Sequence, residues 1–120
     1  MSSPFESHSE LDRIVHEPAR LAILAVLSGC ASADFLFLQG LTGLTKGNLS
    51  VHLAKLESAG LVEITKEFID KKSRTAVSLT RPGRKAFDRH WKQLDELRRA
   101  AEAHRSPGKL SKRAMTIASA

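Results

Sequence analysis

The chain has 120 residues, 42% hydrophobic and 27% charged, which is the balance of an ordinary globular protein with one core. Its formal net charge of +6 favours a polyanionic partner. The single cysteine, Cys30, excludes an internal disulfide and a cysteine-based zinc site, and it fits a reducing cytoplasm. No apolar run approaches the roughly twenty residues of a membrane span, and the first residues carry no signal-peptide pattern. We therefore expect a soluble cytoplasmic protein without a membrane partner.

Three segments are expected along the chain: an N-terminal arm over 1–9, one folded domain over 10–105 and a flexible basic tail over 106–120. Ser9 and Asp12 have the spacing of a capping box, which predicts that a short helix begins there and runs to about residue 16. The tail contains three basic residues and no acidic ones, with little apolar surface to pack.

Three further segments before residue 60 read as helices. Residues 19–28 follow Pro18 and are apolar nearly all round, so this helix must be covered on more than one face. A second helix is expected over 34–40, followed by a turn that holds two glycines. Thr45 can cap a third helix over 46–59, which Gly60 ends. Its apolar residues have the spacing of one inward stripe: Leu49, Leu53 and Leu56.

The next segment predicts a β-hairpin and then a long helix. Residues 61–68 and 75–80 alternate between apolar and polar side chains, and the polar, basic stretch 69–74 joins them as a turn. Thr80 and Pro82 begin a last helix that runs to about residue 104. The fold class is therefore mainly α with a small β-hairpin, in the order of a winged helix-turn-helix with a long C-terminal dimerisation helix.

The outward face of helix 46–59 could contact the base edges of DNA, and we call it the candidate reading surface. Opposite the leucine stripe, small side chains let the backbone approach base edges, and Val51 can touch a thymine methyl. Asn48 can form the paired hydrogen bonds that adenine offers, and Lys46 and Lys55 favour phosphates. Taken by itself, this helix is equally well an ordinary amphipathic helix with a solvated face.

Four stretches in register resemble winged-helix regulators of the MarR and ArsR type. They are His16-Glu-Pro-Ala-Arg-Leu-Ala-Ile-Leu24, Asp34-Phe-Leu-Phe-Leu with Leu44-Thr-Lys-Gly-Asn-Leu49, Leu49-Ser-Val-His-Leu-Ala-Lys-Leu-Glu-Ser-Ala-Gly-Leu-Val62, and Asp70-Lys-Lys-Ser-Arg-Thr-Ala-Val-Ser-Leu-Thr-Arg-Pro-Gly83. The second is most similar to a compact winged-helix DNA-binding subgroup. Together they cover about residues 10 to 97.

The resemblance implies a sequence-specific regulator of double-stranded DNA, usually a repressor, that acts as a two-fold dimer. By position it adds Ser50 and His52 to Thr45, Lys46, Asn48 and Lys55 as DNA contacts. It places Arg74 near the minor groove, oriented by Asp70. Separately, the charge of the hairpin turn predicts that Lys71 and Lys72 contact the DNA backbone. The helical wheel sets His52 beside the buried stripe, so a partly packed histidine is an alternative.

Dimerisation is also predicted from surplus apolar surface. The stripe on the last helix is longer than a small core can cover, and it suggests a seam with the first helix. The expected seam residues are Leu11, Ile14, Val15, Phe87, Trp91, Leu94 and Leu97. The alternative is that the stripe folds back on its own core.

No enzyme, cofactor or metal is expected. The chain lacks a glycine-rich phosphate loop, a paired-carboxylate cleft and a nucleophile–base motif. It also lacks the Cys-x-Cys pair of metal-sensing ArsR proteins, and the spacing of His16, His90 and His104 matches no ligand motif. A pocket between the last helix and the helix-turn-helix can hold a small effector, although no residue demands one. The alternative function is a winged-helix module that binds protein or RNA.

Overall fold

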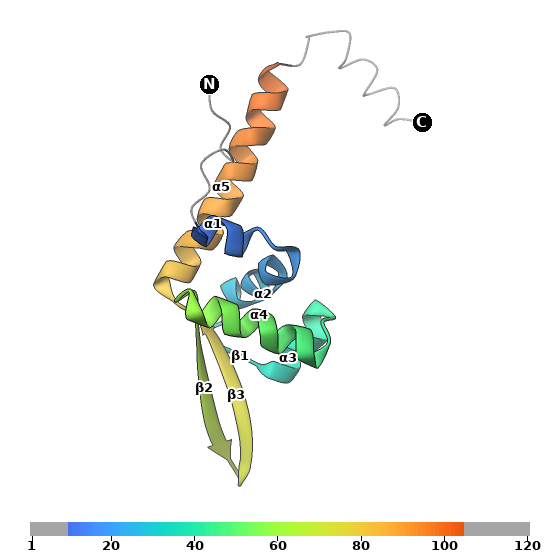
Figure 1. Cartoon of the computed structure of the whole chain (residues 1–120), viewed down its shortest axis with the longest axis vertical. Helices are drawn as coiled ribbons and strands as arrows, with labels where there is room; N and C mark the ends of the chain where they lie inside the picture. The colour runs from blue at the N-terminus through green and yellow to red at the C-terminus, as the bar shows by residue number, and fades with distance from the viewer. Residues whose placement is uncertain (1–9, 105–120) are drawn as a thin grey trace, which may run out of the picture. The chain divides into compact units, whose positions relative to one another are not determined.

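A computed structural model describes residues 10–104, which divide into two units between Trp91 and Lys92. The elements in chain order are α1 (Glu10–Val15), α2 (Pro18–Ser28), β1 (Ala33–Asp34), α3 (Phe35–Thr42), α4 (Lys46–Ser58), β2 (Val62–Ile69), β3 (Lys72–Leu79) and α5 (Arg81–Ala103) (Figure 1). The described residues are mostly helical, and their strands form a three-stranded antiparallel sheet in the order β1–β3–β2. The predicted winged helix-turn-helix with a long last helix is confirmed.

The leucine stripe of α4 lies in the core, as its spacing predicts. Leu49 and Leu56 are fully buried and Leu53 is 3% exposed. They join Ile23, Leu24 and Leu27 from α2, the helix that is apolar nearly all round. The inward side of α4 is therefore fixed by packing, which leaves its other side for solvent or a ligand.

Helix α3 is longer than the sequence suggested. The Asp34 side chain accepts a hydrogen bond from the Phe37 backbone amide at 2.7 Å and caps the N-terminus. The helix continues through Gly40 and ends at Thr42, where Gly43 adopts a left-handed φ of 72°. The expected end at residue 40 is wrong because the second of the two glycines, not the first, supplies the left-handed cap.

The hairpin is also longer, and its turn is shorter, than expected. Strands β2 and β3 pair from Val62 opposite Leu79 to Ile69 opposite Lys72, so only two residues form the turn. Asp70 and Lys71 both have positive φ, at 51° and 65°, as a tight two-residue turn requires. The expected turn over 69–74 is therefore wrong, since all but two of those residues extend the strands.

Strand β1 had no signal in the sequence. Ala33 pairs with Val77 and Asp34 with Ala76, so this two-residue strand covers the far edge of β3. Its shortness explains the omission, because an alternating pattern needs more than two residues to be visible.

The start of helix α5 packs against the residues that follow α4. The Thr80 hydroxyl donates to the Gly60 carbonyl at 2.6 Å and accepts from the Gly83 amide at 3.0 Å. A side chain at Gly83 would collide with the Leu61 carbonyl oxygen, so this position requires glycine. In the unit that begins at Lys92, the Arg98 guanidinium donates hydrogen bonds to Asp95 at 2.7 Å and to Glu102 at 3.1 Å. The Arg98 hydrogen bond lowers the pKa of Asp95.

No helix within residues 10–104 is both long and apolar enough to cross a membrane. The proposed capping residue Ser9, the arm 1–9 and the tail 106–120 lie outside the described residues.

Candidate nucleic-acid interface

The outer face of α4 is an exposed surface of mostly small or polar side chains. Thr45 caps the N-terminus of the helix, and its hydroxyl accepts a hydrogen bond from the Asn48 backbone amide at 3.2 Å. Asn48 and Ser50 are exposed, and Val51 is 57% exposed. The side chain of Asn48 is therefore available to base edges, and the Thr45 oxygen is already used as a cap.

His52 lies in a different setting from the other predicted contacts. Its side chain is 19% exposed, and its Nδ1 accepts a hydrogen bond from Arg20 Nε at 3.3 Å. Glu17 Oε2 lies 3.5 Å from the same nitrogen, and Arg20 also donates to the Ile14 carbonyl at 3.2 Å. This network ties α4 to α2 and to the end of α1. The partly packed alternative describes His52 better than an open base contact does.

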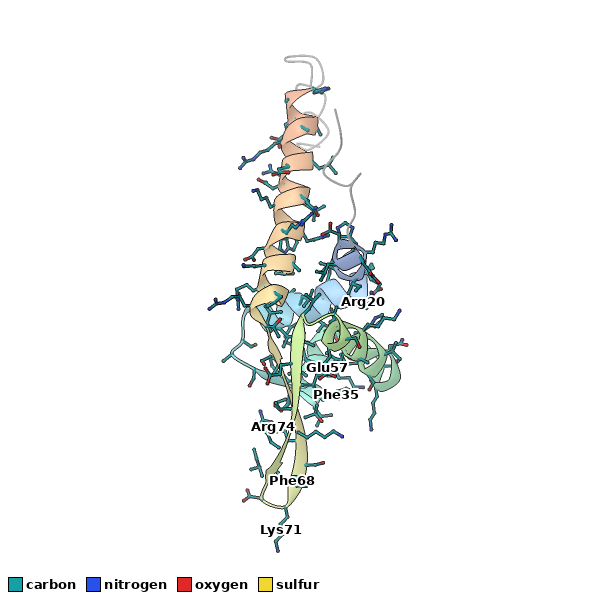
Figure 2. All side chains as sticks on the ribbon, turned by 60° about the vertical axis from the view of Figure 1, so that its left-hand side comes forward. Arg20, Phe35, Glu57, Phe68, Lys71 and Arg74 are labelled. Carbon is teal, nitrogen blue, oxygen red and sulfur yellow. The ribbon has the colours of Figure 1, made fainter. Side chains whose placement is uncertain are left out.

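The wing presents its cations in two ways. Lys71 lies in the turn at the far end of the hairpin, as Figure 2 shows, and Lys72 starts β3. Arg74 lies further back, within β3, where its Nε is 3.7 Å from Asp34 Oδ2. Asp34 rather than Asp70 therefore orients this arginine, which corrects the prediction from the motif. Asp34 serves twice, since its other oxygen caps α3.

A groove of about 790 Å³ runs between the hairpin and the N-terminal parts of α3 and α4. Its lining residues are Asp34, Phe35, Leu36, Gln39, Lys46, Ser50, Ile69, Asp70, Lys72, Ser73, Arg74 and Thr75. One cation of α4 and two of β3 therefore line one concavity, together with a hydroxyl of the candidate reading helix. A groove that carries Lys46, Lys72 and Arg74 suits a phosphate backbone that passes between helix and wing.

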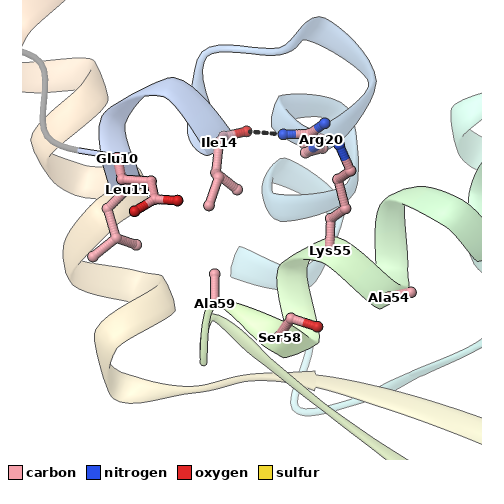
Figure 3. Close-up of a pocket in the computed structure, with 8 residues that line it drawn as sticks. All are labelled: Glu10, Leu11, Ile14, Arg20, Ala54, Lys55, Ser58 and Ala59. Carbon is pink, nitrogen blue, oxygen red and sulfur yellow. Dashed lines mark hydrogen bonds between the residues drawn. The ribbon is translucent and has the colours of Figure 1, made fainter.

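A second pocket, of about 770 Å³, lies between α1, α2 and the C-terminal half of α4 (Figure 3). Ile14 and Leu11 give it apolar surface, and Arg20 and Lys55 bring charge. Its lining residues come from these three helices and from Ala59, directly after α4, so it differs from the expected pocket against the last helix. Lys55 is exposed and can reach either this pocket or a phosphate.

The expected seam residues separate into buried and exposed sets. Val15 is 2% exposed and Phe87 is 7% exposed, so both belong to the core of the chain and offer no surface to a partner. Ile14 is half-buried. The apolar side chains that stay exposed are Leu11 at 41%, Trp91 at 53%, Leu94 at 37% and Leu97 at 41%. The alternative that the stripe packs on its own core applies to Phe87.

Two of the histidines considered as ligands meet inside the unit that ends at Trp91. The rings of His16 and His90 lie edge to face with centroids 4.7 Å apart. Burial lowers the pKa of His90, and the neighbouring His16 lowers it further. Asp12, also buried, accepts from Arg89 at 3.3 Å. Within residues 10–104 no group of three histidine, cysteine or acidic side chains is arranged to hold a metal ion.

These features define a winged-helix nucleic-acid-binding protein: a helix with an inward leucine stripe and an open face, beside a cationic hairpin. Comparison with known proteins gives the family, because residues 19–98 match the model of the winged helix DNA-binding domain. The chain belongs to this family, which agrees with the expectation that it is not an enzyme.

Three known proteins are similar to this chain. An uncharacterised protein of Methanocaldococcus jannaschii is 36% identical over 90 residues, which cover 75% of this chain and 98% of that protein. The structure of a transcriptional regulator homologue from Pyrococcus horikoshii is 32% identical, with a TM-score of 0.70 over 74% of this chain and 88% of that one. A MarR-family transcriptional regulator from Silicibacter pomeroyi shares the fold, with 24% identity, a TM-score of 0.59 and coverage of 92% and 73%.

Several features of the site were not predicted from the sequence. The double role of Asp34 depends on the pairing of β1 with β3, which brings it near Arg74. The Glu17 side chain accepts from the Ala19 and Arg20 amides and so caps α2, and the Glu-Pro pair at residues 17 and 18 was a usable signal for this. The exposure of Phe68, at 80%, had no signal because its position alternates correctly for a buried strand residue.

Proposed function

We propose that this chain is a sequence-specific regulator of transcription that binds double-stranded DNA as a dimeric repressor. Helix 46–59 reads the major groove, and wing 69–74 grips the backbone or minor groove. The observation that carries the proposal is the groove in which Lys46 and Ser50 of α4 face Lys72 and Arg74 of the wing. The description of the Pyrococcus horikoshii protein as a transcriptional regulator homologue supports it.

The residues take two kinds of role in this proposal. Asn48, Ser50 and Val51 are exposed on the middle of α4 and contact base edges. Lys46, Lys55, Lys71, Lys72 and Arg74 contact phosphates or the minor groove. Thr45 holds the end of α4, and His52 positions the helix through Arg20.

The dimer rests on exposed apolar surface. Trp91, Leu94 and Leu97 recur every three residues on α5 and are each more than a third exposed. A helix stripe with this spacing suits a two-fold seam, in which a second copy covers what the chain leaves open. Sedimentation at micromolar concentration should give twice the chain mass, and Trp91→Glu with Leu94→Glu should give the monomer. A monomeric wild type would contradict the dimer.

Selection of duplexes from a random pool by the full chain tests the function. A two-fold sequence is expected, with half-sites about one helical turn apart. If the dimer makes roughly 6–10 phosphate contacts, the slope of log affinity against log salt should be about −5 to −9. Competition with single strands and RNA distinguishes the alternative. A chain that shows no preference for duplex over both competitors is a protein-binding or RNA-binding module instead.

A further inference from the structure

We propose that Phe68 is an apolar wedge, which enters the minor groove of duplex DNA from the end of the wing and contacts the sugars and bases there. The inference rests on the proposed function, since it requires that the chain binds duplex DNA. It adds a contact that neither the family motif nor the cationic groove supplies.

The first support is the exposure of this side chain. Phe68 is 80% exposed, more than any other large apolar side chain that the structure describes; Leu36 follows at 77% and Leu41 at 61%. No other residue of the hairpin covers it, because β2 and β3 bury none of their residues from 65 to 74. Burial of an aromatic ring is strongly favourable, so an open phenylalanine at this place gains most when a ligand covers it.

The second support is the place of Phe68 on the hairpin. It pairs with Ser73, two positions before the Asp70–Lys71 turn begins. Figure 2 shows Phe68 close to Lys71 at the end of the hairpin, beyond Arg74 and away from the helices. A tight two-residue turn keeps this end narrow, so that single side chains rather than the whole ribbon can enter a groove about 6 Å wide.

The third support is the positive charge near the ring, which favours DNA over an apolar protein surface as its partner. Side chains alternate along a strand, so Lys66 shares the face of Phe68. Lys71 lies in the turn, and Lys72, which pairs with Ile69, lies on the other face of the same narrow end. None of these three lysines forms an ion pair with another residue in the described part of the chain. An apolar protein surface would strip water from these cations without compensation. A minor groove offers phosphates at its edges and sugar and base faces inside.

Arg74 does not occupy the end of the wing, where we place the minor-groove contact. It lies further back on β3, with Asp34 at 3.7 Å and Glu67 at the paired position of β2. The arginine that the family motif assigns to the minor groove therefore already has a carboxylate partner near the helices. The apolar side chains at the end of the wing are Phe68 and Ile69, which are 80% and 47% exposed. Phe68 is the larger and more open of the two, so we place its ring between base steps.

The test compares Phe68→Ala with a matched control, Leu41→Ala, which removes another exposed apolar side chain from α3. The probe is the duplex that the wild-type full chain selects from a random pool, labelled at both ends to report bending by energy transfer. Phe68→Ala should bind about ten-fold more weakly and bend the duplex less, because the loss of a wedge is worth on the order of one decade in affinity. Phe68→Leu should restore part of the affinity and part of the bending, and Leu41→Ala should match the wild type in both measurements.

Base substitution locates the contact. At the positions that the wing protects, replacing A·T by inosine·C keeps the minor-groove pattern, and replacing it by G·C adds an amino group there. The penalty of Phe68→Ala should persist on the inosine duplex and vanish on the G·C duplex. An equal response to both would place the ring outside the minor groove and overturn the proposal.

Other outcomes separate this inference from the proposed function. If Phe68→Ala binds and bends like the wild type while Asn48→Ala weakens binding, the wedge is wrong and the regulator stands. If Phe68→Ala instead changes the sedimentation of the DNA-free chain, the ring is a protein contact and the wedge is wrong. If the wild type shows no preference for duplex, the proposed function itself fails.

Discussion

Helix α4 and the wing were both predicted to touch DNA, yet the chain holds them in opposite ways. Helix α4 is fixed on its inner side by Leu49, Leu53 and Leu56, and at its start by the Thr45 cap. Residues 65–74 of the wing are all exposed, and the ion pair between Arg74 and Asp34 is the salt bridge that links this part to the rest of the described residues. The core therefore fixes the position of α4, whereas the exposed part of the wing is defined mainly by its charged side chains.

This difference explains why the two regions suit different tasks. Discrimination between base pairs needs donors and acceptors that are held within narrow limits, which a helix packed into a core provides. Attraction to phosphates varies slowly with distance and tolerates a less constrained element. We therefore expect substitutions in α4 to change stability or specificity, and substitutions of the wing lysines to change affinity on every sequence alike.

The largest expected effect breaks the anchoring of α4. Leu49→Ala should lower the free energy of unfolding by about 2–5 kcal/mol, because it leaves a cavity where a fully buried leucine was. Phe68→Ala, on the exposed end of the wing, should change it by less than about 0.5 kcal/mol. Urea denaturation followed by circular dichroism measures both. Equal losses would show that the wing is as much a part of the folded body as α4.

The next effect concerns reading. Asn48→Ala should reduce affinity for the selected duplex by about 1–3 kcal/mol and relax preference at one or two positions in each half-site. Lys55→Ala is the control on the same helix, and it should weaken matched and scrambled duplexes by similar factors. Binding isotherms on both duplexes decide between these outcomes. If Asn48→Ala leaves discrimination unchanged, the reading surface lies elsewhere.

The sequence was a good guide to α4 because its pattern and its structure have the same cause. A stripe of leucines at helical spacing must be buried, and the same geometry dictates which residues face outward. The Thr45 cap and the left-handed Gly60, with φ of 78°, could be predicted from residue type alone. Most of the candidate reading surface could therefore be predicted without the structure.

The wing was predicted less well because its register depends on pairing between strands. Polar residues after Phe68 resembled a loop, yet Ser73 and Arg74 continue β3 opposite Phe68 and Glu67. The turn uses Asp70 and Lys71 at positive φ, without the glycine that usually marks such turns. The ion pair between Asp34 and Arg74 joins residues far apart in the sequence, and no local pattern can encode it.

A smaller effect sharpens the role of the wing. Lys71→Ala with Lys72→Ala should weaken matched and scrambled duplexes by similar factors, because we propose that these side chains contact phosphates and not base edges. The salt dependence should also become shallower, by about 0.9 for each phosphate that the variant no longer neutralises. Titrations at several salt concentrations measure it, with Glu63→Ala at the base of β2 as a control. A selective loss on the matched duplex would show that the wing reads sequence.

The smallest expected effect probes the ion pair that joins the two regions. Asp34→Asn keeps a side-chain oxygen that can cap α3 and removes the charge that lies 3.7 Å from Arg74. Stability should change by less than about 0.5 kcal/mol, since an asparagine caps nearly as well and an exposed ion pair contributes little. Duplex binding should become about two- to five-fold tighter on every sequence, because Arg74 no longer shares its charge with a carboxylate.

A matched variant separates the cap from the charge. Asp34→Ala removes both, so it should show the same gain in affinity together with a loss of about 1 kcal/mol in stability. If Asp34→Asn instead weakens binding, the carboxylate acts by aiming Arg74 and not by occupying it. Arg74 would then be held in position by Asp34, as the residues of α4 are held by the core. The contrast between a fixed helix and a less constrained wing would not apply to this arginine.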